Sequence, residues 1–166
     1  MKLILFAFAV ALASFPASAA DRWAVETTTS KIDDSTNVVA SMPADEVAMT
    51  RFGRPSEINA ILQCVEGRTG FFIHFGRFYM SDFAGQGVVT VRVDKRKAKR
   101  IPMTGSTDHR ALGLTGGAAI RAAKGMTGKS TLLIAAVPVN EGEVQASFSL
   151  AGFDNAVAAV RAACKW

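Results

Sequence analysis

Residues Ala123–Ser130 carry a sequence pattern that could bind phosphate. The stretch AKGMTGKS has the spacing of a relaxed P-loop. A P-loop requires a buried strand before the loop and a helix after it, so that the helix N-terminus faces the phosphates. Here a helical pattern, AAIRAAKG, comes first and an apolar strand, STLLIAAVPV, follows. Because this order is reversed, we expect a turn between a helix and a strand, and we predict no nucleotide ligand.

A second group of reactive residue types lies at Ser106–His109, where the sequence reads STDH. A hydrolytic triad is assembled in space from separate parts of a chain, whereas Ser, Thr and Asp in one run are typical of a hydrogen-bonded turn or helix cap. The chain also lacks the G-x-S-x-G pattern of serine hydrolases. We therefore predict no catalytic residue. The alternative is a small hydrolase with His109 or His74 as general base.

The potential metal ligands lack the spacing of a metal site. Cys64 and Cys164 are far apart in the chain, whereas zinc sites use closely spaced ligand pairs. Asp33, Asp34 and Ser35 supply oxygen atoms without the regular spacing of a calcium loop, and an Asx-turn explains them. We predict neither a metal nor a cofactor.

The strongest electrostatic feature is a basic run formed by Lys95, Arg96, Lys97, Lys99 and Arg100. One interpretation is a solvated strand end whose charges keep a sheet edge from pairing. The other is a surface that binds an acidic protein or an anionic component of the cell envelope. The formal net charge of +5 for the whole chain is only mildly basic, and we predict no nucleic-acid partner.

The N-terminus has the organisation of a secretory signal peptide. Lys2 precedes an apolar core, LILFAFAVALASF, and Pro16 and the small residues ASAA follow. The core is shorter than the about 20 residues of a membrane-spanning helix. We therefore predict a signal peptide over residues 1–20, a single domain over residues 21–166, no stable membrane span after cleavage, and a periplasmic or secreted location.

The chain has two cysteines, Cys64 and Cys164, and both lie in the predicted exported part. Because exported compartments are oxidising, an even number of cysteines favours a disulfide between them. A pair of free buried thiols is the alternative. A bond between these residues would close a long loop and constrain the unfolded chain.

Apolar periodicity predicts a mainly antiparallel β protein. Strand patterns occur at residues 23–29, 38–42, 57–67, 68–76, 88–94, 130–139 and 141–150. Residues 43–57 contain two prolines and predict a loop, and Glu66-Gly67-Arg68 predicts a hairpin connection. Along residues 88–94, Val89, Val91 and Val93 should share one face.

Two helices complete the expected fold. Residues 118–125 predict a short helix. At the C-terminus an apolar stripe at helical spacing includes Phe153, Val157, Val160 and Cys164. The fold class is therefore α+β, a sandwich-like arrangement of about seven or eight antiparallel strands with a short internal helix and a C-terminal helix.

The order of motifs resembles the VasI (TagO-like) family of exported proteins associated with type VI secretion. The similarity covers nearly all of residues 21–166, and the terminal C-x-W is its most specific part. The matching positions are Trp23, Asp33, Asp34, Ser35, Cys64, Thr69, Arg92, Asp94, Ser106, Thr107, Asp108, Gly152, Cys164 and Trp166.

This resemblance implies a non-enzymatic accessory or interaction protein of the bacterial cell envelope, linked to type VI secretion. It assigns no catalytic role to the matching positions. The tail FSLAGFDNAVAAV also resembles the end of invasion-associated locus B proteins, which have a different cysteine pattern. An invasion-associated locus B-like periplasmic protein is therefore the alternative.

Overall fold

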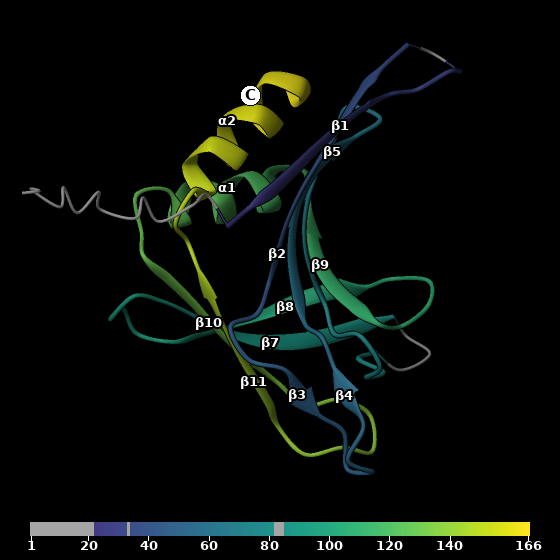
Figure 1. The fold of residues 1–166 in the computed structure, drawn as a ribbon, viewed down its shortest axis with the longest axis vertical. Helices are drawn as coiled ribbons and strands as arrows, with labels where there is room; N and C mark the ends of the chain where they lie inside the picture. Colours follow the sequence, from purple (N-terminus) through teal and green to yellow (C-terminus); the bar gives the residue numbers. More distant parts are fainter. Residues whose placement is uncertain (1–21, 33, 82–84) are drawn as a thin grey trace, which may run out of the picture.

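Alternating apolar and polar residues form strands over most of the chain (Figure 1). The computed structural model describes residues 22–32, 34–81 and 85–166. The strands are β1 (Ala24–Thr29), β2 (Thr36–Pro43), β3 (Ala48–Met49), β4 (Pro55–Ser56), β5 (Asn59–Val65), β6 (Arg68–His74), β7 (Gln86–Val93), β8 (Lys99–Gly105), β9 (Ala111–Thr115), β10 (Thr131–Ala136) and β11 (Val144–Ser149). The helices are α1 (Gly116–Met126) and α2 (Phe153–Cys164).

Nine strands form one antiparallel sheet in the order β1-β2-β5-β6-β9-β8-β7-β10-β11, and β3 pairs with β4 separately. The predicted hairpin between β5 and β6 is confirmed. Its turn residues Glu66 and Gly67 both have positive φ, 50° and 68°, the combination that a two-residue turn between antiparallel strands requires. This turn sets the register in which Cys64 lies opposite Thr69.

The sheet curls until its two ends meet. The Trp23 indole, just before β1, donates a hydrogen bond to the Ser149 carbonyl at the end of β11, with an N–O distance of 3.2 Å. Beyond β2, the Asp45 amide donates to the Ser147 carbonyl and its carboxylate accepts from the Ser147 hydroxyl. These contacts cover part of the β11 edge and give the sheet its sandwich-like form, so the predicted α+β fold class is confirmed.

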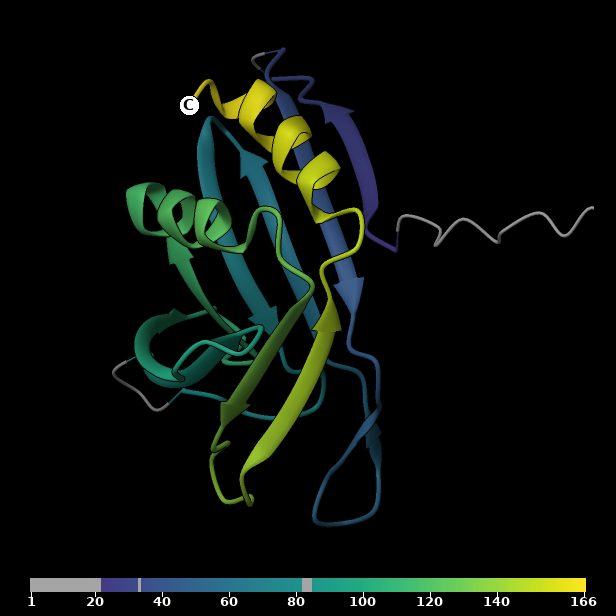
Figure 2. The same ribbon diagram turned by 90° about the vertical axis from the view of Figure 1, so that its left-hand side faces the viewer.

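Both helices lie at the same end of the molecule, opposite the β3–β4 hairpin (Figures 1 and 2). Helix α2 packs on β2 and β5, and α1 packs on β6 and β9. The predicted stripe of α2 is buried at Phe153, Val157 and Val160. The Phe153 ring lies 4.8 Å from the Trp23 ring, measured between centroids, so the C-terminal helix also covers the start of β1.

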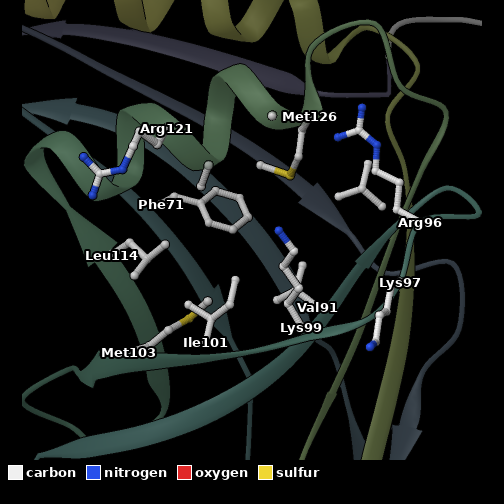
Figure 3. A pocket seen from close by; sticks show the side chains of 13 residues that line it. Phe71, Val91, Arg96, Lys97, Lys99, Ile101, Met103, Leu114, Arg121 and Met126 are labelled. Carbon is white, nitrogen blue, oxygen red and sulfur yellow. The ribbon is translucent and has the colours of Figure 1, made fainter.

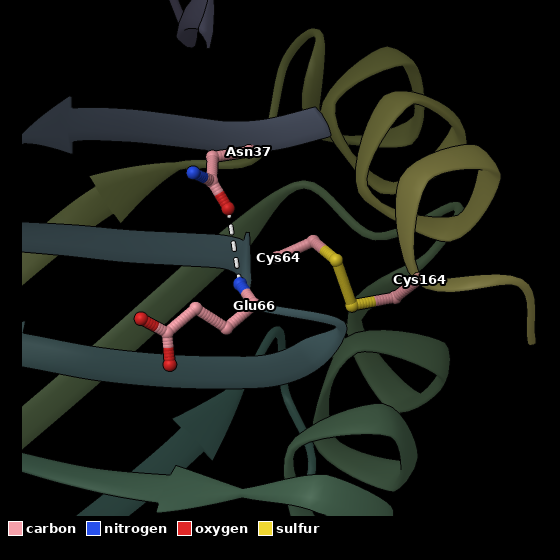
Figure 4. The surroundings of a disulfide bond; sticks show 4 residues. All are labelled: Asn37, Cys64, Glu66 and Cys164. Carbon is pink, nitrogen blue, oxygen red and sulfur yellow. Dashed lines mark hydrogen bonds between the residues drawn. A yellow bond between two sulfur atoms is a disulfide. The ribbon is translucent and has the colours of Figure 1, made fainter. Parts of the chain in front are cut away.

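The predicted disulfide is present. It joins Cys64 of β5 to Cys164 at the end of α2, with a Cα–Cα distance of 5.6 Å and a sequence separation of 100 residues (Figure 4). Cys64 is fully buried. Next to it, the Asn37 side-chain oxygen accepts a hydrogen bond from the Glu66 amide at 3.0 Å, as Figure 4 shows. The disulfide therefore ties the C-terminal helix to the interior strand β5. The turn that follows β5 is itself hydrogen-bonded to Asn37 of β2.

The described residues contain more strands than the about seven or eight that were predicted. Strands β3 and β4 lie in the segment expected to be a loop, although each has only two residues. Strands β8 and β9 lie in a stretch for which no strand was predicted, since Pro102 and a polar turn interrupt its pattern. The predicted signal peptide, residues 1–20, and Asp33 lie outside the described residues.

Candidate functional site

A groove opens where β8 and β9 diverge. These two strands pair only through Thr104 with Gly113 and Gly105 with Leu112, so the start of β8 has β7 as its one neighbour. Helix α1 lies over the gap and leaves a cavity of about 220 Å³. Its apolar floor includes Phe71, Val91, Ile101, Met103 and Leu114 of the sheet, and Met126 of α1 borders it from above (Figure 3). We call this cavity the basic groove, because cations surround the floor.

Four cations line the basic groove: Arg96, Lys97, Lys99 and Arg121. Arg96 and Lys97 lie in the β7–β8 loop, Lys99 begins β8, and Arg121 extends from α1. In Figure 3, Arg96 and Arg121 lie on opposite sides of the floor, and Lys99 extends between them toward α1. Lys97 points away from α1 in the same view.

The structure divides the basic run of the sequence. Successive residues of β8 point to opposite faces of the sheet, so Lys99 shares the groove face with Ile101 and Met103. Arg100 lies on the other face, near Thr90 and Val137. Lys95 is not among the residues that line the groove. The start of β8 pairs with β7 and has no β9 partner among the described residues, so part of the basic run lies at a strand edge.

In the described part of the chain, none of the four groove cations forms an ion pair with a carboxylate, although Arg96 interacts electrostatically with the nearby Asp94. The described residues contain one ion pair, between Arg22 and Asp45, far from the groove in sequence. The lining of the groove includes no acidic side chain. Four positive charges around an apolar floor therefore create an electrostatic potential that attracts an anion.

Asp94 holds the β7–β8 loop in place. Its Oδ1 accepts hydrogen bonds from the Ser130 amide at 2.9 Å and the Thr131 amide at 3.0 Å, which connects the loop to the start of β10. These backbone hydrogen bonds, first that from Ser130, lower the pKa of Asp94 below its ordinary value of 3.8, and the nearby Lys129 and Arg96 lower it further. Arg92 donates from Nε to the Asp94 carbonyl at 3.0 Å.

Three further positions that resemble the VasI motifs, Trp23, Asp34 and Trp166, make contacts within the fold. The Trp23 ring packs against Phe153 of α2, and its indole N–H donates to the Ser149 carbonyl where the two ends of the sheet meet. Asp34 has a φ of 55° in an exposed turn, where its amide donates to the Ser30 carbonyl. The Trp166 ring lies 5.3 Å from the Lys124 ammonium, measured to the ring centroid. None of these side chains lines the basic groove.

Ser106 and Asp108 form the turn between β8 and β9, as predicted for the STDH run. The Asp108 carboxylate accepts from the Ser106 hydroxyl and from the Arg110 amide, and the Ser106 oxygen accepts from the Ala111 amide. The hydrogen bond from Ser106, followed by that from Arg110, lowers the pKa of Asp108. Both hydrogen bonds go to Oδ1 of Asp108, so this oxygen stabilises its own turn.

One contact bears on the hydrolase alternative. The Ser81 hydroxyl lies 2.9 Å from Nδ1 of His109. Ser81 is buried, and in the described residues no carboxylate hydrogen-bonds to the His109 ring. The amide of Met80 donates to the His109 carbonyl. The contacts of Met80 and Ser81 with His109 therefore join the segment before β7 to the β8–β9 turn. His74 accepts from the Gly76 amide, also within a turn.

The P-loop-like stretch has the predicted order of elements, since α1 is followed by a turn and then β10. The Gly128 amide in this turn donates to the Asp154 carboxylate at 3.0 Å. The described residues contain no cluster of three or more His, Cys, Asp or Glu side chains that could hold a metal ion. Within the same part of the chain, neither helix is long and apolar enough to cross a membrane.

Sequence reasoning did not identify Arg121 or the apolar floor as parts of a site. The missing signal was the alternation Lys99-Ile101-Met103 along β8, which places a cation on an apolar face. Recognising that pattern required identifying a strand across Pro102, which ordinarily argues against one.

Comparison with known proteins supports the fold. Neither a model of a known protein family nor a curated protein sequence matches the chain. Among solved structures, the chain is similar to the crystal structure of invasion associated protein B from Bartonella henselae, with a TM-score of 0.54 and 12% identity. The similarity covers 87% of this chain and 94% of that one. The chain therefore shares an overall fold with an invasion-associated protein B.

Proposed function

We propose that this chain is an exported, non-catalytic interaction protein of the bacterial cell envelope, and that its basic groove binds an anionic partner. The observation that carries the proposal is the cluster of four exposed cations around an apolar floor without an acidic side chain in the lining. Complementary charge increases the rate of encounter and the selectivity for an anionic partner.

Export is supported by two features. The N-terminal residues have the pattern of a signal peptide, and a disulfide of the kind found in exported proteins joins Cys64 to Cys164. The fold shared with invasion associated protein B is compatible with an envelope protein. The motif order resembling the VasI family adds type VI secretion as the specific pathway of this proposal.

The absence of catalysis is proposed from the site itself. Within the described residues, the groove lining offers no nucleophile paired with a base, since it consists of apolar residues, lysines and arginines. The Ser81–His109 pair lies elsewhere, and its hydroxyl is buried. A nucleophile must reach its substrate, and the base that activates it must be oriented by a third group. Both conditions favour a binding role.

The test uses two variants with equal changes in charge. Arg96→Glu/Lys99→Glu reverses two cations of the groove, and Lys95→Glu/Arg100→Glu reverses two from the same basic run that lie outside it. Poly-L-glutamate, representing an acidic protein surface, is the probe, and its binding is measured over a range of salt concentrations. We expect the first variant to weaken binding about tenfold or more at low salt and the second to have a small effect.

Thermal unfolding controls for the fold, because all four residues are exposed and both variants should melt close to the wild-type protein. An equal loss of binding in the two variants would show that general charge, and not the groove, attracts the probe. Wild-type protein that does not bind the probe at low salt would exclude an acidic protein surface as the anionic partner.

A further inference from the structure

The floor of the basic groove is apolar surface that packing within the chain leaves partly open to water. Phe71 and Met103 are buried, whereas Val91, Ile101 and Leu114 keep an intermediate exposure. Leu114 faces the gap because β9 has already separated from β8 at this position. Apolar surface exposed in a concave site is stabilised by a ligand that removes it from water.

The size of the groove restricts its occupant. Small-molecule sites enclose about 300–1,000 Å³, and this cavity of about 220 Å³ is smaller. It has room for one slender alkyl chain, whereas two long acyl chains side by side would need more space. Helix α1 borders it with the small residues Ala122 and Gly125, which is why the space beneath the helix remains unfilled.

The charges indicate the other end of the ligand. Lys99 extends between Arg96 and Arg121 over the floor (Figure 3). Among the described residues, none of these three cations has an ion-pair partner. An anionic headgroup near Lys99 would pair with its ammonium and would also lie in the positive potential of Arg96 on one side and Arg121 on the other. Hydrogen bonds between ionised partners are shorter and stronger than neutral ones.

The free edge of β8 presents an alternative, an extended acidic peptide added as a strand. Pro102 lies in the part of β8 that pairs only with β7. Proline has no backbone N–H to donate, and it is a common means by which proteins prevent strand addition at an edge. The edge therefore favours a ligand that needs no ladder of backbone hydrogen bonds.

We propose that the basic groove binds a single alkyl chain with an anionic carboxylate head, as in a medium-chain fatty acid. The chain lies over the Phe71, Ile101 and Leu114 floor, and the carboxylate pairs with Lys99, while Arg96 and Arg121 add positive potential from the two sides of the floor. This inference rests on the proposed function, because it identifies the chemical class of the anionic partner.

The experiment measures binding of decanoate below its micellar concentration by calorimetry. Decanol tests the contribution of the charge, butyrate tests the chain, and phosphatidylglycerol vesicles test a membrane surface. We expect decanoate to bind at one site per chain and about tenfold or more tighter than decanol, and we expect no measurable binding of butyrate or vesicles.

Three variants locate the site. Ala122→Leu places a larger side chain in the groove and should weaken decanoate binding about tenfold or more, as should Lys99→Gln/Arg121→Gln. Lys124→Gln is the matched control, because Lys124 lies on α1 but contacts the Trp166 ring instead of the groove. It should bind decanoate like the wild-type protein. Thermal unfolding confirms that each variant is folded before binding is measured.

Several results would overturn the inference: equal affinity for decanol, unchanged binding in Ala122→Leu, or binding to vesicles alone. If decanoate does not bind while poly-L-glutamate still depends on Arg96 and Lys99, the ligand is a peptide or protein, and the proposed function stands without the fatty acid. If neither probe depends on these cations, both proposals fail.

Discussion

The two helices rest on the same curled sheet but make very different interfaces with it. Helix α2 buries Phe153, Val157 and Val160 and is bonded covalently to β5. Helix α1 buries only Ala119, Ala123 and Met126, and the basic groove opens along its flank. Large side chains complete one interface, whereas small side chains leave space in the other.

Under the proposed function, this contrast separates the part of the domain that stabilises the fold from the part that binds the anionic partner. The contacts of α2 gather the chain end, β1 and β5 into a closed unit, through the Trp23–Phe153 contact and the disulfide. The region beside α1 instead depends on Asp94, whose hydrogen bonds hold the cationic loop against β10. We therefore expect the α2 side to respond to reducing agents and the groove side to respond to acid.

The largest effect should come from removing the disulfide. Cys64→Ala/Cys164→Ala should lower the free energy of unfolding by about 2–5 kcal/mol, because the bond closes a loop of about 100 residues in the unfolded chain. Urea denaturation measures the change, and hydrogen exchange should show α2 opening before α1. Reduction of the wild-type protein should reproduce both effects.

Thiol titration of the denatured but unreduced protein is the direct check on this interpretation. It should detect no free thiol in a monomer. Two free thiols would mean that α2 is held by packing alone, and the contrast between the helices would then rest only on their buried side chains.

An intermediate effect is expected at Asp94, on the groove side. Because folding lowers the pKa of its carboxylate, the group stabilises the folded state fully above the ordinary value of 3.8 and loses this contribution as the pH falls through the lowered pKa. Asp94→Asn should therefore melt at a lower temperature than the wild-type protein at neutral pH, and the difference should shrink as the pH falls below the ordinary pKa of 3.8.

Glu26→Gln is the control for this pH series, because Glu26 is exposed on the edge strand β1. Its melting profile should follow that of the wild-type protein. A difference between Asp94→Asn and the wild-type protein that stays constant down to low pH would show that the hydrogen bonds to Ser130 and Thr131 do not depend on the charge.

The features that the sequence predicts well are those with a local or countable signal. Period-two alternation located β7 and β11, a helical stripe located α2, and the even number of cysteines indicated the bond. The groove has no such signal. The groove arises because β8 separates from β9. Helix α1, which begins more than ten residues after the end of β8, then covers the gap.

The basic run shows the same limit at the level of single residues. In the sequence its five cations look equivalent, and only the pleat of β8 places Lys99 in the groove and Arg100 on the opposite face. Arg121 joins them from a helix that no spacing rule connects to this run. Long-range placement of this kind depends on how the sheet curls, which local patterns do not specify.

The smallest effect concerns Gly125, which tests whether the weak packing of α1 serves stability. Its φ lies outside the left-handed region, and a Cβ added there would meet no atom within 4 Å. Gly125→Ala should therefore raise the free energy of unfolding by about 0.5–1 kcal/mol, since glycine is a poor helix former. Gly128→Ala is the matched comparison, because Gly128 has a φ of 66°, and alanine there should destabilise the protein. Urea denaturation of the two variants should give shifts of opposite sign.

A higher free energy of unfolding in Gly125→Ala would mean that the glycine beside the groove lowers the stability of the protein. A lower free energy of unfolding would contradict this prediction and would mean that the α1 side has no room for a larger side chain.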